Sequence, residues 1–124
     1  MILVDSSGWL EFFTGGPHAG AYASHLKNLR EVVTPTIVLY EVYKIIKRER
    51  SEEEALAAAA QIGKSRLIPL SDIIALTAAD VSLTYRIAMA DAIVYATSLT
   101  EGAKLVTSDA DLASLPGVLY LKKS

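Results

Sequence analysis

The sequence predicts an α/β fold, a three-layer sandwich in which a central, mostly parallel sheet of about five strands is flanked by helices. Short apolar segments that suit buried strands alternate along the chain with longer segments whose apolar residues recur at helical spacing. Helix-capping residues precede these longer segments, and glycine or proline follows most of them. A chain of 124 residues can close one hydrophobic core, so we expect one domain over residues 1–124.

The elements of the first half are predicted from apolar periodicity and capping residues. A strand is expected over Ile2–Asp5, and Ser7 is expected to cap the next helix, which ends at the glycines before Pro17. The further elements expected here are a helix over about 18–29, a strand at Val32–Val33, a helix from Thr36 to Lys47-Arg48, and an alanine-rich helix that Ser51 and Glu54 cap and Gly63 closes.

The second half continues the alternation of strands and helices. The expected elements are a strand over Arg66–Leu70, a helix from the cap Ser71 to about Tyr85, a helix over about Ala90–Thr100 before Gly102, and strands over Lys104–Thr107 and Val118–Leu121. Strands separated by helices are joined by right-handed crossovers, which make neighbouring strands parallel.

Composition excludes several classes of protein. Cysteine is absent, which removes disulfides, zinc–thiolate sites and cysteine nucleophiles and suits the reducing cytoplasm, where we expect the protein to act. No apolar run approaches the roughly 20 residues of a membrane span, so no membrane association is expected. The net charge of −2 argues against a nucleic-acid partner. However, setting five candidate metal-binding acids aside leaves nine acids against 12 bases, an excess of positive charge.

Four acids are predicted to meet at one edge of the sheet. Asp5 and Asp109 follow apolar strands, and the carboxyl ends of parallel strands share the edge at which α/β sheets bind ligands. Glu41 shares a helix face with apolar residues, and Asp91 precedes a nearly continuous apolar run. A buried carboxylate is costly unless it is paired or binds a cation.

Each acid also has an ordinary structural explanation. Asp5 would serve as a turn residue, Asp91 as a helix N-cap, and Glu41 as the partner of Lys44 or of a second helix in a salt bridge. One shared site explains all four together. Carboxylate clusters select hard cations such as Mg²⁺ or Mn²⁺, which hydrolyse phosphodiesters, so the cluster predicts a nuclease.

The ordered motifs resemble those of the PIN-domain ribonucleases, and size and spacing are most like the VapC toxins of toxin–antitoxin pairs. The motifs are Asp5-Ser6-Ser7, Glu41 within a helix, Ala90-Asp91-Ala92 at a helix start, and Thr107-Ser108-Asp109-Ala110-Asp111. The resemblance extends from Ile2 to Leu121. One departure is Leu112, where such proteins often carry an aromatic residue, and it concerns packing more than chemistry.

The resemblance implies a PIN-like sandwich and a function for each motif. Asp5, Glu41, Asp91 and Asp109 would be the catalytic residues that hold Mg²⁺ or Mn²⁺, with Ser7, Thr107 and Asp111 as auxiliary residues. The implied activity is endonucleolytic cleavage of single-stranded RNA by a homodimer that a cognate antitoxin inhibits. The region of Trp9, Phe12 and Phe13 would bind the antitoxin, although these aromatic residues also suit the core.

Basic residues near the acids suggest a path for RNA. Arg86 precedes Asp91, while Lys47 and Arg48 continue the helix of Glu41. Their alternative role is to complement helix C-terminal dipoles and keep the surface soluble.

The sequence leaves two rivals to the nuclease. A catalytically silent PIN-like module that binds RNA or protein is the first alternative, and the presence of all four acids argues against it. A receiver-like or phosphatase-like domain needs a second acid beside Asp5, which the sequence lacks. Gly63-Lys64-Ser65 imitates the end of a phosphate-binding loop, but the first glycine of that motif would fall on Ala58 inside a helix.

Overall fold

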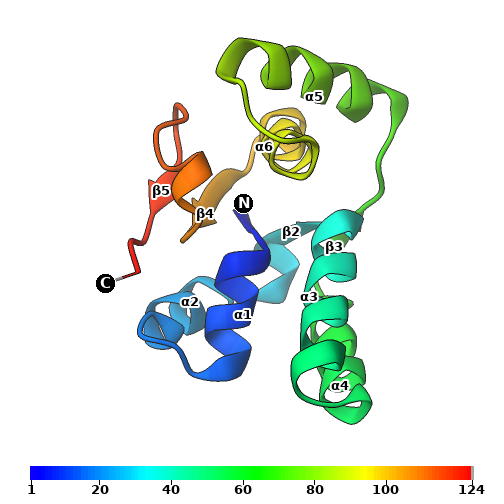
Figure 1. The fold of residues 1–124 in the computed structure, drawn as a ribbon, viewed down its shortest axis with the longest axis vertical. Coiled ribbons are helices and arrows are strands. Elements are labelled where there is room, and N and C mark those ends of the chain that lie inside the picture. Colours follow the sequence, from blue (N-terminus) through cyan, green and yellow to red (C-terminus); the bar gives the residue numbers. More distant parts are fainter. Residues whose placement is uncertain (124) are drawn as a thin grey trace.

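A computed structural model describes residues 1–123 and contains a sheet of five parallel strands in the order β3-β2-β1-β4-β5 (Figure 1). The strands are β1 (Ile2–Val4), β2 (Val32–Pro35), β3 (Arg66–Ile68), β4 (Lys104–Thr107) and β5 (Leu119–Tyr120). Every neighbouring pair is parallel, so the predicted sheet is confirmed and has no antiparallel pair among these strands.

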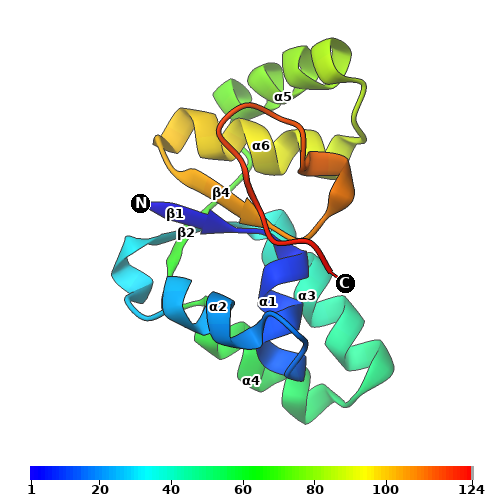
Figure 2. The ribbon, with the colours of Figure 1, turned by 90° about the vertical axis from the view of Figure 1, so that its left-hand side faces the viewer.

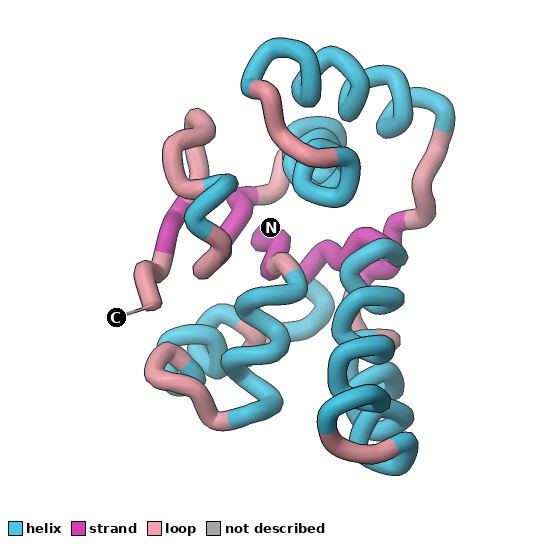
Figure 3. Tube along the Cα trace, in the orientation of Figure 1, coloured by secondary structure: helices cyan, strands magenta, loops and turns pink. Residues whose placement is uncertain are grey.

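Helices cover both faces of the sheet (Figures 1 and 2). One face carries α1 (Ser6–Thr14), α2 (Ala19–His25), α3 (Thr36–Glu49) and α4 (Glu52–Ile62), and the other carries α5 (Asp72–Tyr85) and α6 (Met89–Glu101). Figure 3 shows the strands in magenta between these two groups of helices, which confirms the predicted sandwich. On its side of the sheet α6 lies against the strands, and α5 packs on α6 as an additional outer layer.

Several predicted boundaries and one predicted cap are wrong. The N-cap of α1 is Asp5 rather than Ser7, because Asp5 has extended backbone at the end of β1 and its carboxylate accepts from the backbone N–H of Gly8 at 3.3 Å. The predicted helix over 18–29 ends at His25, since Asn28 leaves the helical conformation and caps a short 3₁₀ helix, η1 (Leu29–Glu31). The third strand stops at Ile68, because Pro69 has no N–H with which to continue the ladder.

Other predicted caps are confirmed. The Ser51 hydroxyl accepts from the Glu54 N–H at 3.0 Å, and the Ser71 hydroxyl accepts from the Ile74 N–H at 3.2 Å. Gly102 ends α6 in the left-handed conformation, with a φ of 63°, which glycine adopts without steric cost. These contacts set the helix ends that the sequence predicts for α4, α5 and α6.

The central strands create the edge at which the acids meet. Val4 of β1 pairs with Val106 of β4, so the two strands end side by side. The crossover from β1 to β2 runs over one face, whereas the chain returns from β3 to β4 over the other. The order of the strands therefore reverses between β1 and β4, and such a reversal opens a crevice at the carboxyl ends of the strands.

No single helix in the described residues is long and apolar enough to cross a membrane. Only α5 and α6 taken together reach the required length and composition, and they are bent by 116° where they join.

Candidate metal centre

Four structural elements bring the predicted acids to the crevice between β1 and β4. Asp5 directly follows β1, and Asp109 lies just beyond β4, where it caps the 3₁₀ helix η2 (Ala110–Leu112). Asp91 lies in the first turn of α6, beyond the N-cap position that was the alternative explanation, and Glu41 lies in the second turn of α3. Burial raises the pKa values of Asp5, Glu41 and Asp91, and the negative charge of Asp109 adds to each shift, so Asp109 lies near all three.

Asp5 is the most enclosed of the acids, with 4% of its surface exposed. The Ser7 hydroxyl donates to one carboxylate oxygen, Oδ1, at 2.7 Å, and the Thr107 hydroxyl donates to the other, Oδ2, at 2.7 Å. Burial raises the pKa of Asp5 to about 6, although these hydrogen bonds oppose the shift. Asp5 is therefore held in one orientation, and its ionised form is costly without a neighbouring cation.

The hydroxyls of Ser7 and Thr107 connect the two central strands. Thr107 Oγ1 accepts from the backbone N–H of Asp109 at 2.9 Å while it donates to Asp5. Ser7 Oγ accepts from the N–H of Ser108 at 3.0 Å. Two of the three predicted auxiliary residues, Ser7 and Thr107, thus contact Asp5 and fix the loop that carries Asp109.

Asp91, Asp109 and Asp111 form the tightest group of carboxylates. Each offers one oxygen, and these oxygens all lie within 4.8 Å of one another. The backbone N–H of Asp111 also donates to Asp109 Oδ1 at 2.9 Å. Burial and the charge of Asp109 raise the pKa of Asp91 to about 7, and a hydrogen bond to Asp109, which only the protonated acid can donate, adds to the shift.

Glu41 completes the acidic surface from the side of α3. It is half-buried, and burial raises its pKa, while a hydrogen bond from Ser6 and the charge of Lys44 lower it. The alternative of a salt bridge with Lys44 is not found, since Glu41 takes part in none of the ion pairs within residues 1–123. The ammonium of Lys44 instead contacts Tyr40.

The residues present fit a hard divalent cation. All the donors are carboxylate oxygens, which Mg²⁺ and Mn²⁺ prefer. Asp91, Asp109 and Asp111 lie close enough to share one ion, so Asp111 belongs with the candidate ligands as well as having the predicted auxiliary position. The ligand set predicted from the sequence, which places Asp5 and Glu41 beside Asp91 and Asp109, stays a prediction.

The predicted RNA-binding residues differ in their surroundings. Lys47 pairs with Glu52 at 3.2 Å, and Arg48 pairs with its neighbour Glu49 at 3.2 Å, so a carboxylate already offsets each charge. Arg86 is exposed and takes part in no ion pair among the described residues. It ends α5 in the left-handed conformation, with a φ of 56° that is unusual for a residue other than glycine.

The sequence assigns no role to three polar residues behind the site. The Ser6 hydroxyl lowers the pKa of Glu41, and the hydroxyls of Tyr22 and Ser108 lie 2.7 Å apart in the interior. Burial and the nearby carboxylates raise the pKa of Tyr22 to about 12, so Tyr22 stays a neutral hydrogen-bonding group. No local pattern points to Tyr22, because its partner is distant in the chain.

Replacing Thr107 tests the link between the two strands. Thr107→Val keeps the shape of the side chain but removes the donor to Asp5 and the acceptor for the Asp109 N–H. We expect a loss of roughly 1–3 kcal/mol in the free energy of unfolding, since a buried N–H loses its partner. We also expect the affinity for Mn²⁺ to fall about 10- to 100-fold, as for other groups that orient metal ligands. Thr107→Ser should restore both quantities in denaturant melts and metal titrations, whereas equal loss in the two variants would contradict the role of the hydroxyl.

Comparison with known proteins assigns this arrangement to a family. A family model described as the PIN domain matches residues 2–118. No curated protein matches the chain.

Solved structures share the fold over nearly the whole chain. A toxin–antitoxin complex from Klebsiella pneumoniae superposes with a TM-score of 0.80 at 23% identity, covering 96% of each chain. VapC20 from Mycobacterium tuberculosis, a toxin that cleaves the sarcin–ricin loop, gives a TM-score of 0.77 at 21% identity, covering 95% of this chain and 97% of that one. VapBC2 from Rickettsia felis, bound to promoter DNA, superposes with a TM-score of 0.74 at 18% identity, and the match covers 100% of each chain. At these identities the likeness establishes the fold.

Proposed function

This chain belongs to the PIN domain family, and we propose that it is a Mg²⁺- or Mn²⁺-dependent endoribonuclease, the toxin of a toxin–antitoxin pair. The observation that carries the proposal is the group formed by Asp91, Asp109 and Asp111 at the reversal of strand order, with Asp5 and Glu41 beside it. A cation bound there would activate water and neutralise charge on the scissile phosphodiester.

The chain's own residues prepare the site for this chemistry. Ser7 and Thr107 hold Asp5 from both sides, so its carboxylate does not need to reorganise when a cation arrives. The N-terminal turns of α1 and α6 lie at Asp5 and Asp91, where the partial positive charge of a helix N-terminus favours carboxylates. These features support a fixed acidic surface that receives a cation and then an RNA phosphate.

A cleavage assay tests the proposed activity. Single-stranded and structured RNAs are incubated with purified protein in Mg²⁺, in Mn²⁺ and in EDTA, and the products are resolved on gels. We expect cleavage with either metal and none in EDTA, because carboxylates alone cannot generate hydroxide at neutral pH. Full cleavage in EDTA would exclude the metal mechanism. RNA binding with no cleavage under any of these conditions would favour the silent-module alternative.

The antitoxin is proposed to bind between α1, α3 and α4. The complexes from Klebsiella and Rickettsia support a protein partner for this fold. A cavity of about 200 Å³ lies there, and its lining combines apolar side chains with one cation and one anion. Trp9 is completely buried and part of the core, so of the aromatic residues predicted for this role, Phe13 is the one that lines the cavity.

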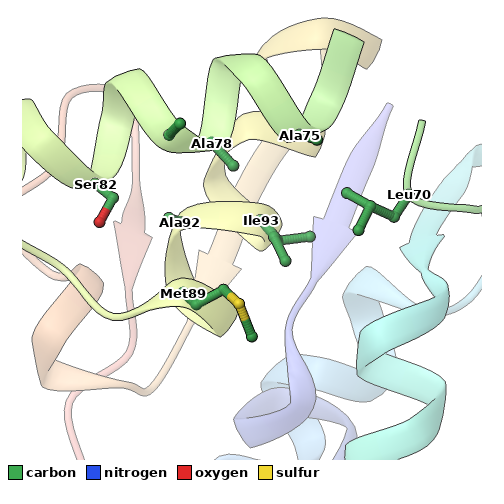
Figure 4. A pocket seen from close by; sticks show the side chains of 8 residues that line it. Leu70, Ala75, Ala78, Ser82, Met89, Ala92 and Ile93 are labelled. Carbon is green, nitrogen blue, oxygen red and sulfur yellow. The ribbon is translucent and has the colours of Figure 1, made fainter. Parts of the chain in front are cut away.

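The outer helix α5 is the proposed interface for a second copy. Ile73, Leu76 and Leu83 follow heptad spacing along α5, and each is more than 60% exposed. An apolar cavity of about 280 Å³ lies between α5 and α6, and Figure 4 shows Leu70 and Met89 at its rim. α5 is therefore apolar on both its inner and its outer face, as is usual for a helix covered from both sides.

Charged residues placed among the exposed apolar side chains of α5 should separate the two subunits of the proposed dimer. Leu76→Asp with Leu83→Asp changes exposed positions, so the monomer should keep its fold while the apolar contact is lost. Light scattering should give a dimer for the original protein and a monomer for the double variant. A monomer for both proteins, or a dimer for both, would contradict this interface.

Two substitutions of Arg86 separate its charge from its backbone conformation. Both Arg86→Ala and Arg86→Gly remove a candidate phosphate contact, so both should weaken RNA binding and flatten its salt dependence. Because φ is 56°, glycine should give the more stable protein, by about 1 kcal/mol relative to alanine. Binding titrations at several salt concentrations and denaturant melts measure the two effects. If the slope of log affinity against log salt is unchanged in both variants, Arg86 does not contact RNA and serves only as a charged surface residue.

A further inference from the structure

Two tyrosine–lysine pairs lie along α3, and only one of them is beside the acidic site. The Lys44 ammonium lies 4.9 Å from the centre of the Tyr40 ring, and the Lys47 ammonium lies 5.5 Å from that of Tyr43. Both pairs have the one-turn spacing that brings side chains together on a helix. The first pair brackets Glu41, whereas the second lies one turn further from it.

The two lysines differ in the charge available to a ligand. Lys47 is paired with Glu52 at 3.2 Å. Lys44 has no carboxylate within ion-pair distance among residues 1–123, and its charge acts on Glu41. Lys44 is therefore the α3 lysine whose charge is still available for a phosphate near the acidic site.

The two tyrosines differ in exposure. Tyr40 leaves 58% of its surface in contact with solvent, while Tyr43 is half-buried and packs against the core. The Tyr40 hydroxyl accepts from Lys44 at 3.2 Å, which holds the ring and the cation together as one surface feature. An exposed aromatic ring joined to a cation is the combination with which proteins bind unpaired bases of single-stranded nucleic acid.

We propose that Tyr40 and Lys44 form an RNA-binding platform on which one unpaired base stacks against the Tyr40 ring while Lys44 binds an adjacent phosphate. The proposal rests on the proposed function and assigns to two residues of α3 the recognition of an unpaired base and of the phosphate beside it. RNA that approaches the carboxylates is repelled by them, and Lys44 supplies a compensating charge from the α3 side. A base within a duplex cannot offer its face to the ring, so the platform discriminates against paired RNA.

Binding measurements without cleavage test the platform directly. A short fluorescein-labelled single-stranded RNA is titrated with protein in EDTA, and polarisation gives the dissociation constant. Tyr40→Leu, which keeps an apolar side chain but removes the ring, should weaken binding about tenfold, as expected for the loss of one stacked base. Tyr40→Phe should bind as the original protein does. Because Tyr40 is exposed, melting temperatures of these variants should agree and so exclude unfolding as the cause.

The matched pair of lysines tests the phosphate contact. Lys44→Ala should reduce the slope of log affinity against log salt by about 0.7, which is one phosphate contact of a single strand. Lys47→Ala should change it much less, since Glu52 offsets that charge. A duplex of the same sequence should bind equally to the original protein and to Tyr40→Leu.

The outcomes separate this proposal from the nuclease proposal. The platform would be overturned if Tyr40→Leu bound RNA as tightly as the original protein. It would also be overturned if Lys44→Ala and Lys47→Ala reduced the slope of log affinity against log salt equally. Either result would count even if the protein cleaves RNA with metal. A tenfold loss specific to Tyr40→Leu and to single strands supports the platform even if no cleavage occurs in any metal. In that case the failure lies with the proposed activity alone.

Discussion

Asp109→Asn should abolish RNA cleavage, lowering the rate by at least about 10³-fold. Removing one electrostatic contact from a reaction centre lowers the catalytic rate about 10²- to 10³-fold, and Asp109 also affects the neighbouring carboxylates. Its charge acts on Asp5, Glu41 and Asp91. The amide keeps the Oδ1 that accepts from the Asp111 N–H at 2.9 Å, so the fold should remain. Initial rates in saturating Mn²⁺, together with circular dichroism, measure the two quantities.

The same change elsewhere in the chain is the control. Asp72 is exposed in the first turn of α5, away from the acidic group, so Asp72→Asn should cleave at the original rate. Amide replacements of Asp5, Glu41 and Asp91 should each reduce cleavage strongly as well. Original rates in any two of the four amide variants would exclude this centre.

Metal-free protein should melt at a lower temperature near pH 8 than near pH 5. Burial raises the pKa of Asp5 to about 6 and that of Asp91 to about 7, from an ordinary value of 3.8 for each. The folded state therefore binds more protons than the unfolded state between about pH 4 and pH 7, and stability falls as pH rises through this interval. Between pH 5 and pH 6 alone, Asp5 accounts for a loss of about 1 kcal/mol, because its carboxyl falls to half protonation in the folded state over this interval.

Asp91 is half-exposed and solvent screens part of its effect, so we expect a total fall in melting temperature of about 5–10 °C. Mg²⁺ or Mn²⁺ binds the folded, ionised cluster and should raise the melting temperature most near pH 8. Asp109→Asn removes the repelling charge, so this variant should be more stable than the original without metal and respond less to metal. Melts at both pH values, with and without metal, measure these differences. If metal leaves the original melting temperature unchanged near pH 8, or if the amide variant is markedly less stable, the acids do not share a cation.

The sequence predicts those parts of the fold that depend on local pattern. Alternation of strands and helices predicts the parallel sheet, and the apolar strands before Asp5 and Asp109 predict that β1 and β4 end together, as Val4 and Val106 do. Caps such as Ser51 and Ser71 are confirmed because a cap depends on residues within one turn.

The remaining details depend on contacts that no local pattern records. The N-cap of α1 is Asp5 and not the predicted Ser7. Aspartate and serine both cap helices well, so the position at which β1 ends decides which of them is the cap. The approach of Asp111 to Asp91 and the contact of Tyr22 with Ser108 join segments far apart in the chain. Likewise, the charge of Lys47 is offset by Glu52 of the next helix, which helix periodicity alone does not indicate.

The hydrogen bond from Thr107 to Asp5 joins residues 102 positions apart, and this separation has a consequence during biosynthesis. A ribosome releases Asp5, Glu41 and Asp91 before β4, so a nascent chain carries most of the acids but neither the hydroxyl that orients Asp5 nor Asp109. Since β1 lies between β2 and β4 in the sheet, the unfinished polypeptide also lacks one of the two neighbours of its first strand. On the proposed function, the growing chain would therefore be inert beside the messenger and ribosomal RNA that produce it until β4 and Asp109 have also left the ribosome.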